Sequence, residues 1–243
     1  HHGPNDTAKT PSAAEQALTV ILPPDGAILA TVKPDADSVT AMAVLASRLE
    51  GRLIDGVIVK KVGEFDRLGP SAGRPISVVL AISMMACEHT IPLHKRVAWV
   101  QNALWGGIRS EEIMSLCIRH ENDMDVACAA SIVHTAAGGG IAVVESTHRG
   151  ALALGYEIAL VVVAYNPSMP DGAGGSYRKF TVCRYDDHVR VDMAGTLADL
   201  QDMEPGWGGR GDIFGSPQGV SSGLSLDEVV DVVTRHLIDG PHQ

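Results

Sequence analysis

The sequence predicts an α/β fold in two domains, on three observations. Short apolar segments of strand length alternate with helical patterns in the first half of the chain, as in a parallel sheet covered by helices. A run of glycines near residue 138 then precedes a half rich in strand patterns. Hydrophobic residues form 45% of the 243 residues, enough for buried cores. We expect a parallel-sheet domain at residues 16–135, a smaller mixed-sheet domain at 136–243, and a ligand-binding cleft between them.

The N-terminal segment predicts no folded element. Residues 1–12 are polar and show no apolar periodicity, and the two histidines at the start are typical of an affinity-tag remnant. We therefore assign residues 1–15 to a disordered tail without a functional role.

A βαβ unit is predicted at the start of the first domain. Residues 27–33 (AILATVK) predict a strand, and residues 38–50 predict a helix with Asp37 or Ser38 as its N-cap. Residues 57–62 (VIVKKV) predict the next strand, which would pair in parallel with the first through a right-handed crossover.

Helices dominate the rest of the first domain, and strands dominate the second. Residues 76–88 fit either a strand or a helix, and residues 92–104 and 110–133 predict helices. In the second domain we expect strands at 141–145, 158–164, 178–184 and 189–192, and helices at 147–154, 196–203 and 225–237.

Composition excludes several classes of protein. With 19 Lys and Arg against 29 Asp and Glu, the net charge of −10 disfavours binding to duplex nucleic acid. Aromatic residues form only 4%, which argues against a groove that stacks single-stranded bases. The 4 cysteines lie far apart, so a zinc cage is not expected. No signal peptide and no apolar run of membrane-spanning length is found, and we expect a cytoplasmic protein with no membrane partner.

Two aspartates lie where the first predicted strand gives way to a helix. Alternate residues of an extended turn point the same way, so Asp35 and Asp37 would converge. A cation or a shared proton would offset their repulsion, and Mg²⁺ and Mn²⁺ prefer oxygen ligands. The residues alone leave two alternatives open, namely a divalent metal site and a helix N-cap beside a solvated aspartate.

Two segments of the chain resemble the DHH phosphoesterase superfamily. Residues 32–39 (VKPDADSV), followed by an apolar helix, resemble its first motif, His-x-Pro-Asp-x-Asp at the end of a strand. Residues 206–217 (GWGGRGDIFGSP), ahead of a terminal helix, resemble the glycine-rich loop of its smaller C-terminal domain. The resemblance implies an N-terminal domain that binds two Mn²⁺ ions and a C-terminal domain that closes over the substrate. It covers residues 27–237 in layout.

The resemblance also implies a set of metal ligands, with departures from the family pattern. It assigns Asp35, Asp37 and Asp66 to Mn²⁺ or Mg²⁺. Lys33 stands where the family has a metal-binding histidine, and an ammonium has no lone pair to offer. Arg210 replaces the loop histidine, and its guanidinium suits a phosphate contact. No Asp-His-His motif is present, so one ion, or none, is expected in place of two.

The glycine-rich segment predicts an anion site on physical grounds as well. Glycines let successive backbone N–H groups turn inward around an anion. The backbone at Gly208 and Gly209, the charge of Arg210 and the hydroxyl of Ser216 would hold a phosphate, and Trp207 would stack on a base. The alternative is a flexible surface loop.

Further basic residues lie near predicted strand ends. His148 and Arg149, between a strand and a short helix, would neutralise phosphate charge, or would be exposed residues beside an ordinary helix cap. Arg178 and Lys179 at the head of another strand form a second basic pair, either on the face toward the cleft or as edge residues.

Two functions fit these expectations. The first is a metal-dependent phosphoesterase that hydrolyses a phosphodiester or phosphoanhydride in a small nucleotide or short oligonucleotide. The aspartates would generate the hydroxide, and Lys33, His148, Arg149 and Arg210 would stabilise the transition state. The second is a catalytically degenerate protein of the same fold that binds a nucleotide or phosphate. A homodimer stays open in either case.

Overall fold

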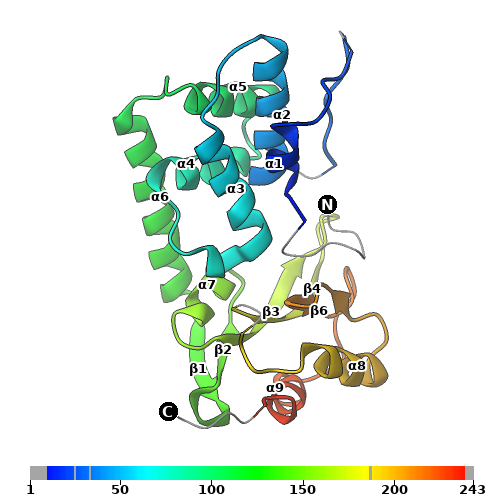
Figure 1. Cartoon of the computed structure of the whole chain (residues 1–243). Coiled ribbons are helices and arrows are strands. Elements are labelled where there is room, and N and C mark those ends of the chain that lie inside the picture. Colours follow the sequence, from blue (N-terminus) through cyan, green and yellow to red (C-terminus); the bar gives the residue numbers. More distant parts are fainter. Residues whose placement is uncertain (1–9, 25, 33, 186–187, 239–243) are drawn as a thin grey trace. The chain divides into compact units, whose positions relative to one another are not determined.

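The chain divides into two compact units, His1–Asn122 and Asp123–Gln243. The computed structural model describes residues 10–24, 26–32, 34–185 and 188–238 of the chain. Figure 1 shows a helical first unit and a second unit built on a sheet. The coarse α/β prediction is confirmed, whereas the cleft between domains stays a prediction.

The described residues of the first unit form helices and turns only, so the predicted parallel sheet is wrong for this part of the chain. Its elements are α1 (Ala13–Ala17), α2 (Ala36–Leu49), α3 (Gly56–Leu68), the 3-10 turn η1 (Gly69–Ala72), α4 (Ser77–Ala86), α5 (Leu93–Leu104) and the first part of α6 (Ser110–Ala129).

Both strands predicted in this unit are absent, for different reasons. Residues 27–32 have no regular structure and belong to no strand, and Ile28 is 92% exposed. Residues 57–62 lie inside α3. The side chain of Asp55 caps that helix, and Val59 and Val62, three residues apart, are buried on one helical face. Helical spacing and a strong N-cap outweigh the strand preference of the valines.

The helix predictions in this unit are confirmed, with changes at their ends. Asp35, not Asp37 or Ser38, is the N-cap of α2. The ambiguous segment at 76–88 is helix α4, and Pro92 is the N-cap of α5. Helix α6 stops at Ala129, four residues short of the prediction, because the chain then enters a strand.

The core of the first unit includes the segment that was expected to be a tail. Ser12 and Ala14 are fully buried, and residues 13–17 form α1, so the tail prediction is wrong for residues 12–15. Apolar residues of α1 to α5 make one cluster: Ala14, Ala17, Val39, Ala43, Val44, Val59, Val62, Val79, Ile82, Ala86, Val100, Ala103 and Leu104.

The second unit is built on a six-stranded mixed sheet in the order β1-β2-β3-β4-β6-β5. The strands are β1 (Ile132–Ala136), β2 (Ile141–Glu145), β3 (Val161–Pro170), β4 (Ser176–Arg184), β5 (Gly208–Gly209) and β6 (Ile213–Gly215). Strands β2 and β3 are parallel, joined through α7 (Ala151–Tyr156), and the other neighbours are antiparallel. The glycines near residue 138, including the 3-10 turn η2 (Ala137–Gly139), connect β1 to β2, so they join two strands of one sheet.

Two clusters cover opposite faces of this sheet. On one face α8 (Met193–Met203) and α9 (Leu226–Arg235) pack over Phe180, Val182 and Phe214. On the other face α7 packs over a smaller cluster that contains Val162 and Cys183. Successive strand residues point to opposite faces, which is the alternation seen along β4.

Most elements predicted in this unit are confirmed. The strand predicted at 141–145 is β2, and the Ser225 capping box opens α9. The strand predicted at 189–192 is wrong, because Val191 makes only an isolated bridge to Leu237. Among the described residues, no helix combines the length and apolar character needed to cross a membrane.

Candidate anion-binding site

Polar side chains lie on the α7 side of the sheet, beyond the area that α7 covers. The register pairs Asn166 of β3 with Lys179 of β4. Glu145 of β2 pairs with Tyr165 of the parallel strand β3, so the next residues along the two strands, Ser146 and Asn166, are also neighbours. Because neighbours in register share a face, these three residues form a row across β2, β3 and β4. We call Ser146, Asn166 and Lys179 the polar row.

The polar row lies at the carboxyl end of β2, where its parallel pairing with β3 stops, and Asn166 lies within β3, which continues to Pro170. In α/β sheets this edge is where ligands bind, since the loops that follow the strands open there. The segment after β2 makes a compact turn: the N–H of His148 donates to Ser146 Oγ at 3.0 Å, and the N–H of Gly150 donates to His148 Nδ1 at 3.0 Å. A neutral His148 therefore carries its proton on Nε2.

Lys179 reaches over the glycine-rich hairpin. Its Nζ donates to the main-chain oxygen of Ser216. A Cβ at position 215 would lie 3.2 Å from Lys179 Nζ and 2.7 Å from the main-chain oxygen of Phe180. Only glycine at position 215 leaves room for this arrangement. The position of the Lys179 ammonium therefore requires glycine at this point of the hairpin.

The ammonium of Lys179 is half-buried, and burial lowers its pKa. No carboxylate forms an ion pair with it in the part of the chain that the structure describes. A partly desolvated cation without a counter-ion is stabilised when an anion binds to it. Lys179 is thus the residue of the polar row with the strongest preference for an anion.

The glycine-rich segment forms a short hairpin of β5 and β6 and not an open loop. Gly209 requires glycine, because a Cβ there would clash with the main-chain oxygen of Ile213 and its φ is 157°. The N–H of Arg210 donates to that same oxygen at 2.7 Å. The guanidinium of Arg210 pairs with Asp212 at 3.3 Å, so its charge is already compensated.

Two residues predicted to bind substrate lie in the core. Trp207 is 2% exposed, stacks on Phe180 and donates from Nε1 to Glu204 at 2.9 Å. Ser216 is 2% exposed, and its Oγ accepts the N–H of Phe180 at 3.0 Å. Neither the indole nor the hydroxyl is available to a base or a phosphate, because burial and internal hydrogen bonds use both.

Glu204 fixes the hairpin, although no sequence pattern assigned it a role. Its Oε2 accepts from Trp207 Nε1 and, at 2.8 Å, from Ser222 Oγ, and its Oε1 accepts from the N–H of Gly223 at 2.6 Å. One carboxylate therefore holds the chain on both sides of the hairpin. No motif in the sequence signals this, since its partners lie 3, 18 and 19 residues away.

The remaining predicted phosphate ligands are only partly brought together. His148 lies in the turn beside Ser146, at one end of the polar row. Arg149 forms an ion pair with Asp123, which compensates its charge. Lys33 lies outside the described residues.

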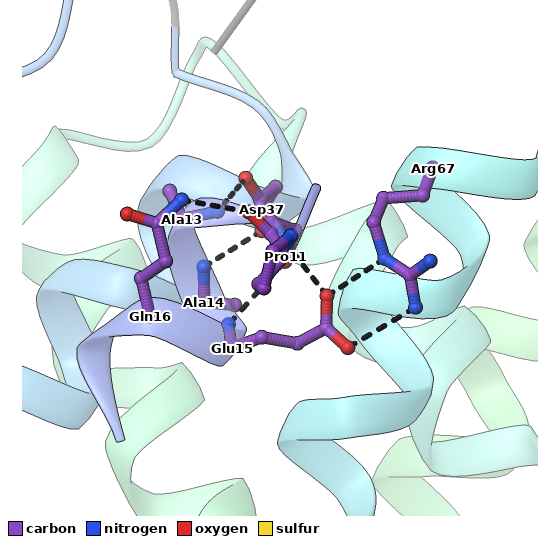
Figure 2. Close-up of polar contacts among 8 residues, drawn as sticks. Pro11, Ala13, Ala14, Glu15, Gln16, Asp37 and Arg67 are labelled. Atoms are coloured by element: carbon purple, nitrogen blue, oxygen red, sulfur yellow. Dashed lines mark hydrogen bonds and ion pairs between the residues drawn. The ribbon is translucent and has the colours of Figure 1, made fainter. Parts of the chain in front are cut away.

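The residues predicted to hold a metal do not fit a shared site. Asp35 Oδ1 accepts the N–H of Ser38 at 2.8 Å as the N-cap of α2. Both carboxylate oxygens of Asp37 accept main-chain N–H groups, as Figure 2 shows. Asp66 lies on α3. No three His, Cys, Asp or Glu side chains are grouped for a metal ion within residues 10–24, 26–32, 34–185 and 188–238. Binding of Mn²⁺ or Mg²⁺ stays a prediction.

No protein-family model matches this chain, and no curated protein is significantly similar to it. The resemblance to the DHH superfamily therefore stays a prediction that depends on the two motifs.

Proposed function

We propose that this chain binds a small phosphate-bearing ligand, such as a nucleotide, on the polar row of the second unit. The observation that carries the proposal is the half-buried ammonium of Lys179, which lies over Gly215 and Ser216 with no carboxylate counter-ion among the described residues. A phosphate would supply the missing negative charge.

Asn166 and His148, beside Lys179 and Ser146 respectively, suit the same ligand. Among the described residues, Asn166 Nδ2 donates only to the sulfur of Met169, at 3.6 Å, a weak acceptor that a phosphate oxygen would replace. Ser146 is 5% exposed and its Oγ accepts the N–H of His148, so it holds the turn in place and does not contact the ligand. His148 Nε2–H adds a further donor at this end of the row. The site combines several donors with the ammonium of Lys179, which favours a compact phosphate over an extended duplex.

Metal-dependent hydrolysis of a phosphodiester or phosphoanhydride is the second candidate. The Asp35-Ala36-Asp37 pattern and the glycine-rich segment favour it. The hydrogen bonds of Asp35 and Asp37 favour binding without turnover, because they already use oxygens that a metal would need. We therefore prefer the second of the two functions that the sequence suggests.

Calorimetry with ADP, 5′-phosphorylated diadenylate and adenosine tests the proposal. The two phosphate-bearing compounds should bind, and adenosine should bind at least about tenfold more weakly. Lys179→Met should weaken binding about 10- to 100-fold, the effect of losing a charge-assisted hydrogen bond. Arg178→Met is the matched control, since this neighbouring cation lies on the opposite face of the same strand. Equal affinity of Lys179→Met and the unmodified protein would refute the assignment. Product formation with added Mn²⁺ would favour the second candidate.

A further inference from the structure

Asp37 is the most fully engaged carboxylate of the motif that resembles a metal site. It lies in the first turn of α2 and is 4% exposed. Its Oδ2 accepts the N–H of Ala13 at 2.9 Å, and its Oδ1 accepts the N–H of Ala14 at 2.8 Å (Figure 2). Both donors belong to the start of α1.

These donors are groups that a short helix cannot satisfy by itself. The first N–H groups of a helix have no intrahelical acceptor. In α1, the carboxylate of Asp37 accepts the N–H groups of Ala13 and Ala14, and Ser12 Oγ accepts the N–H of Glu15 at 3.3 Å. Asp37 thus supplies acceptors from a distant part of the chain.

The rest of α1 is held as firmly. Glu15 Oε2 accepts the N–H of Ser12 at 2.8 Å, which completes a capping box. Its carboxylate also pairs with Arg67 of α3, with contacts of 2.8 and 3.1 Å that Figure 2 shows. Gly63 of α3 has no room for a side chain, because a Cβ there would clash with Ser12 Oγ. Residues 12–17 are therefore part of the folded unit.

We infer that Asp37 anchors residues 12–17, and that the Asp-x-Asp pattern of this chain is structural. Asp35 caps α2, and Asp37 binds the start of α1. A cation at Asp37 would displace two N–H donors and lie beside the positive end of α1, so metal binding and the docking of α1 exclude each other. This anchor belongs to the first unit and does not depend on phosphate binding by the second.

Three substitutions separate an anchor from a metal ligand. Asp37→Asn replaces one acceptor oxygen with an NH₂ group, which cannot accept a hydrogen bond from the N–H that it faces. Asp35→Asn is the matched control, because asparagine is as good an N-cap as aspartate but a poorer ligand for a hard cation. Ala13→Pro removes one donor to Asp37, and proline suits this first helical position, after a Ser12 whose backbone is already extended.

The readout is thermal unfolding in EDTA and in millimolar MnCl₂. In EDTA, Asp37→Asn should lower the Tm by about 5 °C or more, and Asp35→Asn should change it by about 1 °C at most. Ala13→Pro should lower the Tm of the unmodified protein more than that of Asp37→Asn, since asparagine keeps an acceptor for only one of the two N–H donors. MnCl₂ should raise none of these values.

Two results would overturn the inference. One is a Mn²⁺-dependent rise in Tm that both Asp35→Asn and Asp37→Asn abolish. The other is an unchanged Tm for Asp37→Asn in EDTA. If Asp37→Asn does not fold, Ala13→Pro decides in EDTA: a lower Tm supports the anchor, and an unchanged Tm refutes it. Calorimetry with ADP on the same variants reports the proposed phosphate site separately.

Discussion

The side chain of Lys179 reaches over Gly215: its ammonium lies 3.2 Å from the place that a Cβ at residue 215 would occupy. A side chain there would displace the lysine and press on the main-chain oxygen of Phe180. Gly215 therefore determines where the ammonium of Lys179 lies, in addition to any role in the β5–β6 hairpin.

Gly215→Ala should reduce both stability and phosphate affinity. We expect a loss of about 1–3 kcal/mol in the free energy of unfolding, as for overpacking at a close contact, measured by urea denaturation. Gly211→Ala is the control, since a Cβ at 211 meets nothing within 4 Å. Similar stability of the two variants would show that the contact at residue 215 relaxes without cost.

The affinity for phosphate should fall at high pH sooner than an ordinary lysine allows. Burial lowers the pKa of Lys179, so this ammonium loses its proton below the usual 10.5. The unfolded chain binds that proton more tightly, so the lysine destabilises the fold at neutral pH and this cost disappears as the pH rises toward 10.5. Calorimetry with ADP between about pH 7 and 10 measures the loss of affinity. Lys179→Arg should keep its affinity over this range, because arginine stays charged.

Acid should destabilise the first unit through Glu15. Burial raises the pKa of this carboxyl, but the hydrogen bonds and charge of Arg67 and the N–H of Ser12 outweigh it, and the pKa lies below 4.5. Its contribution to stability is present above the pKa of the unfolded chain and is lost as the pH falls through the lower folded value. Between about pH 3 and 6, Glu15→Gln should show a smaller fall in Tm than the unmodified protein. Glu64→Gln, which breaks a half-exposed pair between neighbouring turns of α3 with Lys61, is the control and should change the pH dependence less than Glu15→Gln.

Glu204→Gln should loosen the hairpin of β5 and β6. An amide cannot accept from Trp207, Ser222 and Gly223 at once, and its NH₂ group would face a main-chain donor. We expect a loss of about 1–3 kcal/mol, followed by circular dichroism in urea, and weaker binding of ADP. The exposed Glu157 provides the control substitution, Glu157→Gln. If Glu204→Gln binds ADP as tightly as the unmodified protein, phosphate binding by the polar row does not depend on the order of the hairpin.

The sequence predicted the second unit better than the first, for a physical reason. Buried strands such as β2 are continuous apolar runs between turn residues, and these patterns are short-range. Residues 57–62 show the same composition but form helix α3, because the cap at Asp55 and the partners of its buried face decide the outcome. Such partners lie far away in the sequence, where a local pattern carries no information about them.

The candidate site was predicted in part. The glycine-rich segment and the pair Arg178 and Lys179 were found from residue types alone, but not which cation lies over the hairpin. Trp207 was misassigned because an aromatic beside glycines fits a base as well as a core, and only the stacking on Phe180 distinguishes them. Asp37 was misleading for a related reason, since its two N–H donors lie 24 and 23 residues earlier.

The docking of α1 also sets an order of events during synthesis. This helix leaves the ribosome before either of its partners, and its ion pair with Arg67 spans 52 residues. Bringing the ends of so long a segment together costs conformational entropy before the ion pair forms. A helix of 5 residues is also not stable alone. Among the described helices of the first unit, the one synthesised first is therefore expected to be among the last to reach its native position, after α2 and α3 have formed.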